Sequence, residues 1–173
     1  MDWDVHHGEG TQKIFYNRND VLFISLHRYD KGKFFPHIPE SSSSHTGGPH
    51  AAGMNVNVCW DLPEKAKGEA FEREETCGDE EYAHAFDCLV MPILKEYSPD
   101  MVFVSCGFDS ACGDPIGGLL LSQVGYTYMT RRLTELKRKV LLVLEGGYNP
   151  DVLLWASEAV LRALTSTTPK DVD

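Results

Sequence analysis

The apolar positions of the chain fall into four short runs, each of the length of a buried β-strand: residues 21–26, 54–58, 102–106 and 140–144. Apolar side chains at helical spacing follow in three longer stretches: residues 82–96, a stretch capped by Ser122 that runs to about Arg138, and one that starts at Asn149 and Pro150. Strands that alternate with helices predict a single α/β domain in which helices cover both faces of a mainly parallel sheet, a three-layer αβα arrangement.

Polar residues with metal-binding chemistry stand beside two of these runs. Asp2, Asp4 and His6 occupy alternate positions, so in an extended segment their side chains would share one face. Asp109 comes shortly after the run 102–106, at the carboxyl end of a predicted strand, where α/β proteins place functional residues. Carboxylates with an imidazole are suitable donors for a divalent metal. We therefore expect a metal site, with a polar strand end as the plainer alternative.

A third polar segment follows the run 140–144. There, Gly146 and Gly147 precede Tyr148. Two glycines allow the backbone to approach a site closely, while the tyrosine hydroxyl offers a hydrogen-bond donor. Taken alone, a tyrosine at this position is also typical of a half-buried packing residue.

Composition narrows the class of protein. The formal net charge of −10 argues against direct binding of nucleic acid, because phosphate contacts require clustered Lys and Arg. No apolar run approaches the roughly 20 residues that cross a bilayer, so we expect no membrane partner. The five cysteines include no Cys-X-X-Cys pair, which favours a reducing, intracellular compartment and gives no support to a cysteine zinc site.

Taken together, the motifs resemble the zinc-dependent histone deacetylases, most closely the class II branch (class IIb-like). The likeness extends from residue 2 to about residue 164 and is carried by five motifs: DWDVHHGEGTQ at 2–12, SLHRYD at 25–30, FFP at 34–36, SCGFDSACGDPIGG at 105–118 and LEGGYN at 144–149. The resemblance implies the arginase/deacetylase fold, of which this chain would form part. It also implies hydrolysis of the acetyl-lysine amide in histones or other proteins, with release of acetate.

Residue roles carry over by resemblance, position by position. The implied zinc ligands are Asp4, His6 and Asp109, and the implied catalytic phenol is Tyr148, which would polarise the substrate carbonyl. The implied substrate-binding residues are Phe35, Ile116, Gly146 and Gly147. Potassium is the second implied cofactor, with an inner site at Asp2, Ser25 and Leu26 and an outer site at the carbonyls of Phe15, Arg18 and Val21.

The family's proton-transfer pair of adjacent histidines has no counterpart in this sequence. In the family the pair precedes the aspartate motif, where this sequence has only Met1, and His6 already occupies a ligand position. We therefore expect residues 1–173 to be the carboxyl-terminal part of a single deacetylase domain, inactive when alone and exposing part of its core. The implied partners are acetylated lysines and a corepressor complex, in the nucleus, the cytoplasm or both.

Three alternatives stay open at this point. A binuclear manganese hydrolase of the arginase type would need further aspartates where this chain has Gly8 and Ala111. A non-catalytic scaffold would share the fold without the reaction. An acetylpolyamine deacetylase would carry an acidic gatekeeper where this chain has Ile116. Glu9 departs from the family, in which class II members usually have Asn and class I members Asp at that place.

Overall fold

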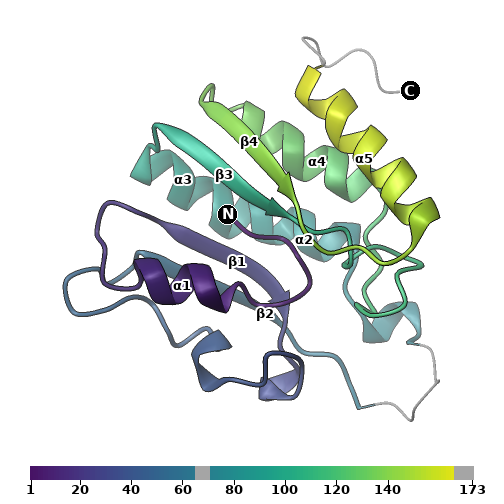
Figure 1. Ribbon diagram of the computed structural model, residues 1–173, viewed down its shortest axis with the longest axis horizontal. Helices are drawn as coiled ribbons and strands as arrows, with labels where there is room; N and C mark the ends of the chain where they lie inside the picture. Colours follow the sequence, from purple (N-terminus) through teal and green to yellow (C-terminus); the bar gives the residue numbers. More distant parts are fainter. Residues whose placement is uncertain (65–70, 166–173) are drawn as a thin grey trace.

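The computed structural model describes residues 1–64 and 71–165 (Figure 1). Its strands are β1 (Phe23–Arg28), β2 (Asn55–Trp60), β3 (Met101–Cys106) and β4 (Lys139–Leu144). Its α-helices are α1 (Glu9–Phe15), α2 (Asp79–Ala85), α3 (Met91–Tyr97), α4 (Gln123–Thr134) and α5 (Pro150–Thr165). Within the described part of the chain, no helix is both long enough and apolar enough to cross a membrane.

The strands form two parallel pairs that Asp2 joins. β1 pairs with β2 so that Phe23 lies opposite Asn55, and β3 pairs with β4 so that Met101 lies opposite Lys139. Asp2 forms parallel bridges to Ser25 in β1 and to Ser105 in β3. The predicted parallel sheet is therefore confirmed, and the start of the chain lies between its two halves.

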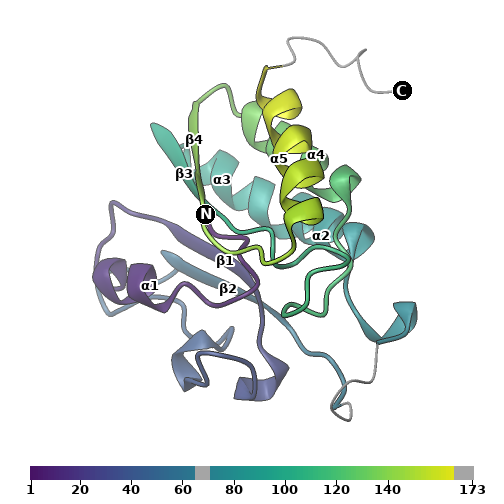
Figure 2. The ribbon, with the colours of Figure 1, turned by 45° about the vertical axis from the view of Figure 1, so that its right-hand side comes forward.

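Helices lie on both sides of this sheet, as expected for the three-layer fold. Figure 2 shows α1 on one side and α3, α4 and α5 on the other. Val102 and Val104 of β3 are buried in the main core, whereas Phe103 is 59% exposed on the opposite face, as is the neighbouring Leu141 at 44%. The face of β3 and β4 on the side of Phe103 and Leu141 is therefore uncovered, as expected for a chain that exposes part of its core.

Local sequence explains where the helices begin and end. Ser122 caps α4 as predicted, since its Oγ accepts a hydrogen bond from the Val124 amide at 3.0 Å. α4 ends at Thr134, four residues before the predicted limit. The predicted helix 82–96 is divided into α2, a π-helical turn (Phe86–Val90) and α3, with a proline in the first turn of α3, where its missing amide is tolerated.

A cavity of about 730 Å³ opens between β1 and β3, beside Met1. Its lining includes Ile24 of β1 and Phe103 of β3. Phe15 and Val21, two of the residues predicted to bind an outer potassium ion, also line it. The three predicted zinc ligands do not contribute to this cavity.

Candidate metal centre

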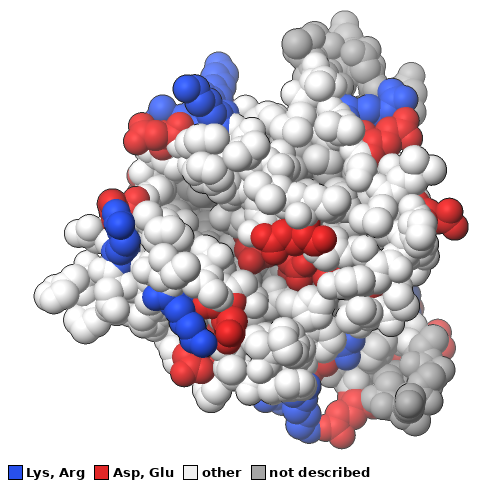
Figure 3. Space-filling view, viewed as in Figure 1, with Lys and Arg blue, Asp and Glu red and all other residues white. Residues whose placement is uncertain are grey.

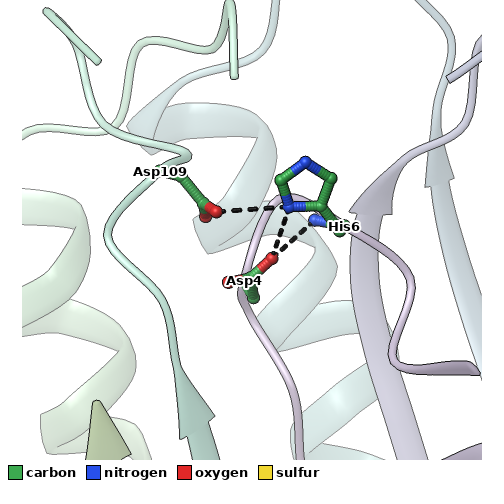
Figure 4. Close-up of side chains that lie close together, drawn as sticks. All are labelled: Asp4, His6 and Asp109. Atoms are coloured by element: carbon green, nitrogen blue, oxygen red, sulfur yellow. Dashed lines mark hydrogen bonds and ion pairs between the residues drawn. The ribbon is translucent and has the colours of Figure 1, made fainter. Parts of the chain in front are cut away.

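Asp4, His6 and Asp109 converge into one cluster, although His6 and Asp109 are 103 positions apart in the sequence. One potential ligand atom of each residue lies within 4.8 Å of the others. His6 Nδ1 is 2.9 Å from Asp4 Oδ1 and 3.3 Å from Asp109 Oδ2 (Figure 4). Both carboxylates are buried and the imidazole is partly exposed. The structure thus brings together all three predicted zinc ligands.

The segment that carries Asp4 and His6 is bent rather than extended. Asp2 forms an isolated bridge and residues 4–6 form a bend. Asp2 Oδ1 accepts the Asp4 amide at 3.1 Å, and Asp4 Oδ1 accepts the His6 amide at 2.8 Å. Each aspartate therefore stabilises a turn two residues long, as short polar side chains often do. The alternation argument correctly placed Asp4 beside His6, but its extended backbone is wrong, and Asp2 does not belong to the cluster of potential ligands.

Asp109 offers the cluster one oxygen without a hydrogen bond. Its Oδ1 accepts the Val5 amide at 2.7 Å, which links the loop after β3 to the segment that carries His6. Its Oδ2 is buried and makes no hydrogen bond of good geometry within the described residues; its partner is the His6 imidazole, whose Nδ1 forms an ion pair with it at 3.3 Å. A buried oxygen with so weak a partner is costly. A bound cation would satisfy it.

Glycine backbone leaves room for the two carboxylates. The Gly146 amide donates to Asp4 Oδ2 at 3.0 Å. A Cβ atom at Gly146 would lie 2.0 Å from Asp109 Oδ2 and 2.5 Å from Asp4 Oδ2, and one at Gly107 would lie 2.3 Å from Asp4 Oδ2. These distances are far below van der Waals contact. The loops after β3 and β4 can therefore lie this close to the carboxylates only because Gly107 and Gly146 have no side chain.

The cluster carries an excess of negative charge in a partly buried place. Burial alone would lower the pKa of His6, but its close contacts with the Asp109 and Asp4 carboxylates and their negative charges outweigh burial and raise that pKa to about 9. Burial raises the pKa of Asp109, to which the charge of Asp4 also contributes. Figure 3 shows acidic side chains at the centre of one face of the molecule, although Asp109 itself is fully buried and Asp4 is 7% exposed. A divalent cation would replace the proton that this arrangement favours.

Aromatic side chains surround the imidazole. Phe34 stacks on His6 with ring centroids 5.3 Å apart and 17° between the planes, and Phe35 meets the same ring edge-on at 5.8 Å. Tyr148 is 52% exposed. Burial, followed by the charges of Asp109 and Asp4, raises its pKa. The negative charges of both carboxylates in the cluster therefore act on the Tyr148 hydroxyl and favour its protonated form.

The two predicted potassium sites differ in their structure. The residues of the inner set lie next to one another, because Asp2 pairs with Ser25 in the sheet and its carbonyl accepts the Leu26 amide at 3.0 Å. Burial raises the pKa of Asp2 well above its usual value, and the charge of Asp4 adds to this. In the outer set, the Phe15 carbonyl accepts the Arg18 amide at 2.8 Å, and the connection that carries it joins α1 to β1, at a distance in sequence from the cluster.

His7 belongs to a buried polar network and not to the cluster. Its Nε2 is hydrogen-bonded to Gln12 Oε1 and its Nδ1 to Ser41 Oγ, each at 2.9 Å. Both ring nitrogens are therefore engaged, which agrees with the interpretation that His6 and His7 are not a proton-transfer pair. Glu9, the residue that differs from the family pattern, forms an ion pair in which its Oε2 lies 3.3 Å from Lys13 Nζ.

Sequence reasoning missed three residues that support the site: Phe34, Arg28 and Asp114. The Arg28 guanidinium lies 4.6 Å from the ring centroid of Phe34 and donates to the Gly117 carbonyl at 3.0 Å. Asp114 binds backbone amides of two loops. Asp114 stands between glycine and proline, a turn signal that could have drawn attention to it, whereas the contact between Arg28 and Gly117 joins residues 89 apart.

Comparisons with known proteins identify the family to which the chain is similar. Residues 1–164 match the family model described as the histone deacetylase domain. Histone deacetylase 5 of Arabidopsis thaliana is 39% identical over 165 residues, which are 95% of this chain and 23% of that protein. Human histone deacetylase 7 is 45% identical over 95% of this chain and 16% of its own length. The crystal structure of the HDA15 HD domain superposes with a TM-score of 0.84 at 40% identity, over 94% of this chain and 43% of that one.

Proposed function

Because this chain belongs to the histone deacetylase family, we propose that it supplies the metal site of a class II, zinc-dependent lysine deacetylase. The observation that carries the proposal is the convergence of Asp4, His6 and Asp109, with a buried Asp109 oxygen that makes no hydrogen bond of good geometry in the described residues. The chain spans less than a quarter of the curated relatives' length. The activity is therefore proposed for the whole protein, on acetyl-lysine in histones or other proteins.

The donor set fits zinc. Asp4 and Asp109 would each provide a carboxylate oxygen and His6 its Nδ1, the three atoms that already lie within 4.8 Å of one another. Three protein ligands without a thiolate leave a coordination position open, as in catalytic rather than structural zinc sites. When bound, zinc supplies an activated water at neutral pH and polarises the amide carbonyl.

The protein's own groups orient the substrate around that centre. The Tyr148 hydroxyl would donate a hydrogen bond to the acetyl oxygen as negative charge develops on it, the role of an oxyanion donor. Gly146 and Gly147 let the loop after β4 approach the reacting amide, since a side chain at Gly146 would overlap both carboxylates. Phe35 and Ile116, which are 61% and 45% exposed, would contact the methylene stem of the lysine.

An inner potassium ion would support these ligands from behind. Asp2 directly precedes the segment that carries Asp4 and His6, it pairs with Ser25, and its carbonyl accepts the Leu26 amide. A cation there would offset the charge of the buried Asp2 carboxylate and hold the ligand segment in place. The family further suggests action in the nucleus or the cytoplasm, with a corepressor complex as a partner.

The test is the metal content of an Asp109→Ala variant of the complete protein. Loss of a group that only hydrogen-bonds a metal ligand lowers metal affinity roughly 10-fold to 100-fold. Loss of the ligand Asp109 itself should lower zinc affinity by more, so that little zinc remains bound after dialysis. Asp100→Ala, which removes an exposed carboxylate, is the matched control and should retain zinc. Elemental analysis after dialysis measures both. Equal zinc in the two variants would contradict the assignment.

A further inference from the structure

Two loops carry the proposed catalytic groups. The loop after β3 holds Asp109, and the loop after β4 holds Tyr148. Asp114 lies in the first loop, is 9% exposed and takes no part in the metal cluster. A buried carboxylate needs strong partners, and those of Asp114 are all backbone amides.

Asp114 uses both of its oxygens to join the loops. Its Oδ1 accepts the amides of Ile116 at 2.8 Å and Gly117 at 3.2 Å, which closes the turn of its own loop. Its Oδ2 accepts the amide of Tyr148 at 2.8 Å. Hydrogen bonds to an ionised acceptor are shorter and stronger than neutral ones. One side chain therefore connects the turn after Asp109 to the backbone of the tyrosine.

The hydrogen bond from the Tyr148 amide to Asp114 matters because the two glycines before Tyr148 can adopt many backbone conformations. Gly147 has φ of +128°, a conformation that L-residues rarely adopt and that glycine adopts at little cost. The other two bonds between the loops lie on either side of Tyr148: the Phe108 amide donates to the Gly146 carbonyl, and Asn149 Nδ2 donates to the Gly113 carbonyl, each at 2.8 Å. The half-exposed phenol thus depends on its own backbone amide for a defined position.

We propose that Asp114 is a positioning residue that sets the place of Tyr148 relative to Asp109. Its consequence for turnover rests on the proposed deacetylase function, whereas its structural part does not. The carboxylate acts through the Tyr148 backbone and touches neither metal nor substrate. Removing it leaves the three metal donors unchanged but allows the phenol to leave the geometry that stabilises a developing oxyanion.

Amide hydrogen exchange of the purified protein tests the structural part directly. Asp114→Ala removes all three acceptor contacts, and Asp114→Asn keeps the shape but leaves one oxygen for two sets of amides. In Asp114→Ala, exchange of the Tyr148 amide should become at least about tenfold faster, as expected for loss of a charge-assisted bond. The Gly146 amide, bonded to Asp4 Oδ2, should keep its rate. Asp100→Asn is the matched control.

Should Asp114→Ala fail to fold, Asp114→Asn decides the question. Its side-chain NH₂ must face either Tyr148 or the pair Ile116 and Gly117, so the amides on that side should exchange faster. Unchanged exchange at all three amides would overturn the inference, whatever the protein's activity. Unchanged zinc content is also expected, and loss of zinc in Asp114→Asn would mean that Asp114 supports the ligands instead.

Kinetics of the complete enzyme then tests the link to Tyr148. Asp114→Asn should lower kcat at least about tenfold with KM changed less than about twofold, as for an interaction made in the transition state. In the Tyr148→Phe background the same substitution should have almost no further effect, because the hydroxyl that it displaces is gone. If the double variant loses kcat by the product of the two single losses, Asp114 does not act through Tyr148. A parent enzyme without deacetylase activity would refute the proposed function, and hydrogen exchange would still decide the role of Asp114.

Discussion

Asp109 reaches the cluster because its neighbours leave it space and because one of its oxygens is already committed. The Val5 amide holds Oδ1, so only Oδ2 is directed at His6. Gly146 and Gly107 supply the space, and both touch the carboxylates through backbone alone. The geometry of the metal centre therefore depends on the missing side chains of Gly146 and Gly107 as well as on the donor atoms.

Gly146→Ala tests this space. Its Cβ would lie 2.0 Å from Asp109 Oδ2, so the loop or the carboxylate must move and the affinity for zinc should fall at least about tenfold, as when an outer-shell support is lost. Gly10→Ala is the control, because no atom lies within 4 Å of its Cβ, and in α1 it should add about 0.5–1 kcal/mol of helix stability. Titration with a competing chelator measures zinc affinity, and equal affinities in the two variants would contradict the argument.

Substrate choice is tested at Ile116, which is 45% exposed. An aliphatic side chain suits the methylene stem of a peptide lysine, whereas a carboxylate would attract a polycationic amine. In the complete enzyme, Ile116→Glu should shift the ratio of kcat/KM toward acetylspermidine over an acetyl-lysine peptide by about tenfold, near 1.4 kcal/mol. Val124→Glu, at an exposed position on α4, should leave the ratio unchanged. A parent enzyme that already prefers acetylspermidine would favour the polyamine alternative.

At the scale of elements, apolar runs predicted all four strands to within two residues of their observed ends. They did so because buried parallel strands are continuous apolar segments. α1 was missed, since Gly8 and Gly10 and a mostly polar composition conceal its helical character. The interruption between α2 and α3 was missed as well, because a π-helical turn keeps an apolar spacing close to that of an α-helix.

The candidate site was predictable in its donors but not in its supports. Motif resemblance identified Asp4, His6 and Asp109, which the structure brings together. The stacking of Phe34 on His6 and the contact of Arg28 with the loop after β3 depend on how distant segments pack. No local pattern encodes such contacts, so only the folded chain reveals them.

The burial of His27 in β1 should make the free energy of unfolding depend on pH. It is fully buried, with Nδ1 hydrogen-bonded to Ser25 Oγ and Nε2 to the Ser41 carbonyl, each at 2.9 Å. Burial, and then the charge of His7, lower its pKa to about 3. Since the unfolded chain binds this proton near pH 6.5, the stabilisation is complete above pH 6.5 and declines as pH falls toward 3, by at most about 1.4 kcal/mol per unit.

Urea denaturation between pH 7.5 and 4.5 measures this dependence. His27→Gln, which cannot titrate, should show a shallower loss of unfolding free energy on acidification than the parent. His50→Gln changes an exposed histidine and should keep the parental slope. The same slope in all three proteins would show that His27 does not contribute.

At the scale of the whole molecule, the sheet is covered unevenly. α1 contacts β1, and α4 and α5 pack together on the other side of the sheet. Beyond α1, apolar side chains of β3 and β4 remain uncovered: Met101, Phe103, Leu141, Val143 and Leu144. Adjacent exposed apolar side chains on this scale favour association between molecules. The net charge of −10 opposes that association by repulsion, most strongly at low salt.

A matched pair of threonine substitutions in β3 separates the open face from the core. Phe103→Thr, on the open face, should change the free energy of unfolding by less than about 1 kcal/mol, because threonine keeps a high β-propensity, and should reduce self-association at high salt. Val104→Thr, at a fully buried position, places a hydroxyl in the core and should cost about 1–3 kcal/mol. Urea denaturation and light scattering of the 173-residue chain measure the two quantities. If Phe103→Thr destabilises the chain as much as Val104→Thr does, Phe103 is packed in solution and this face is not open.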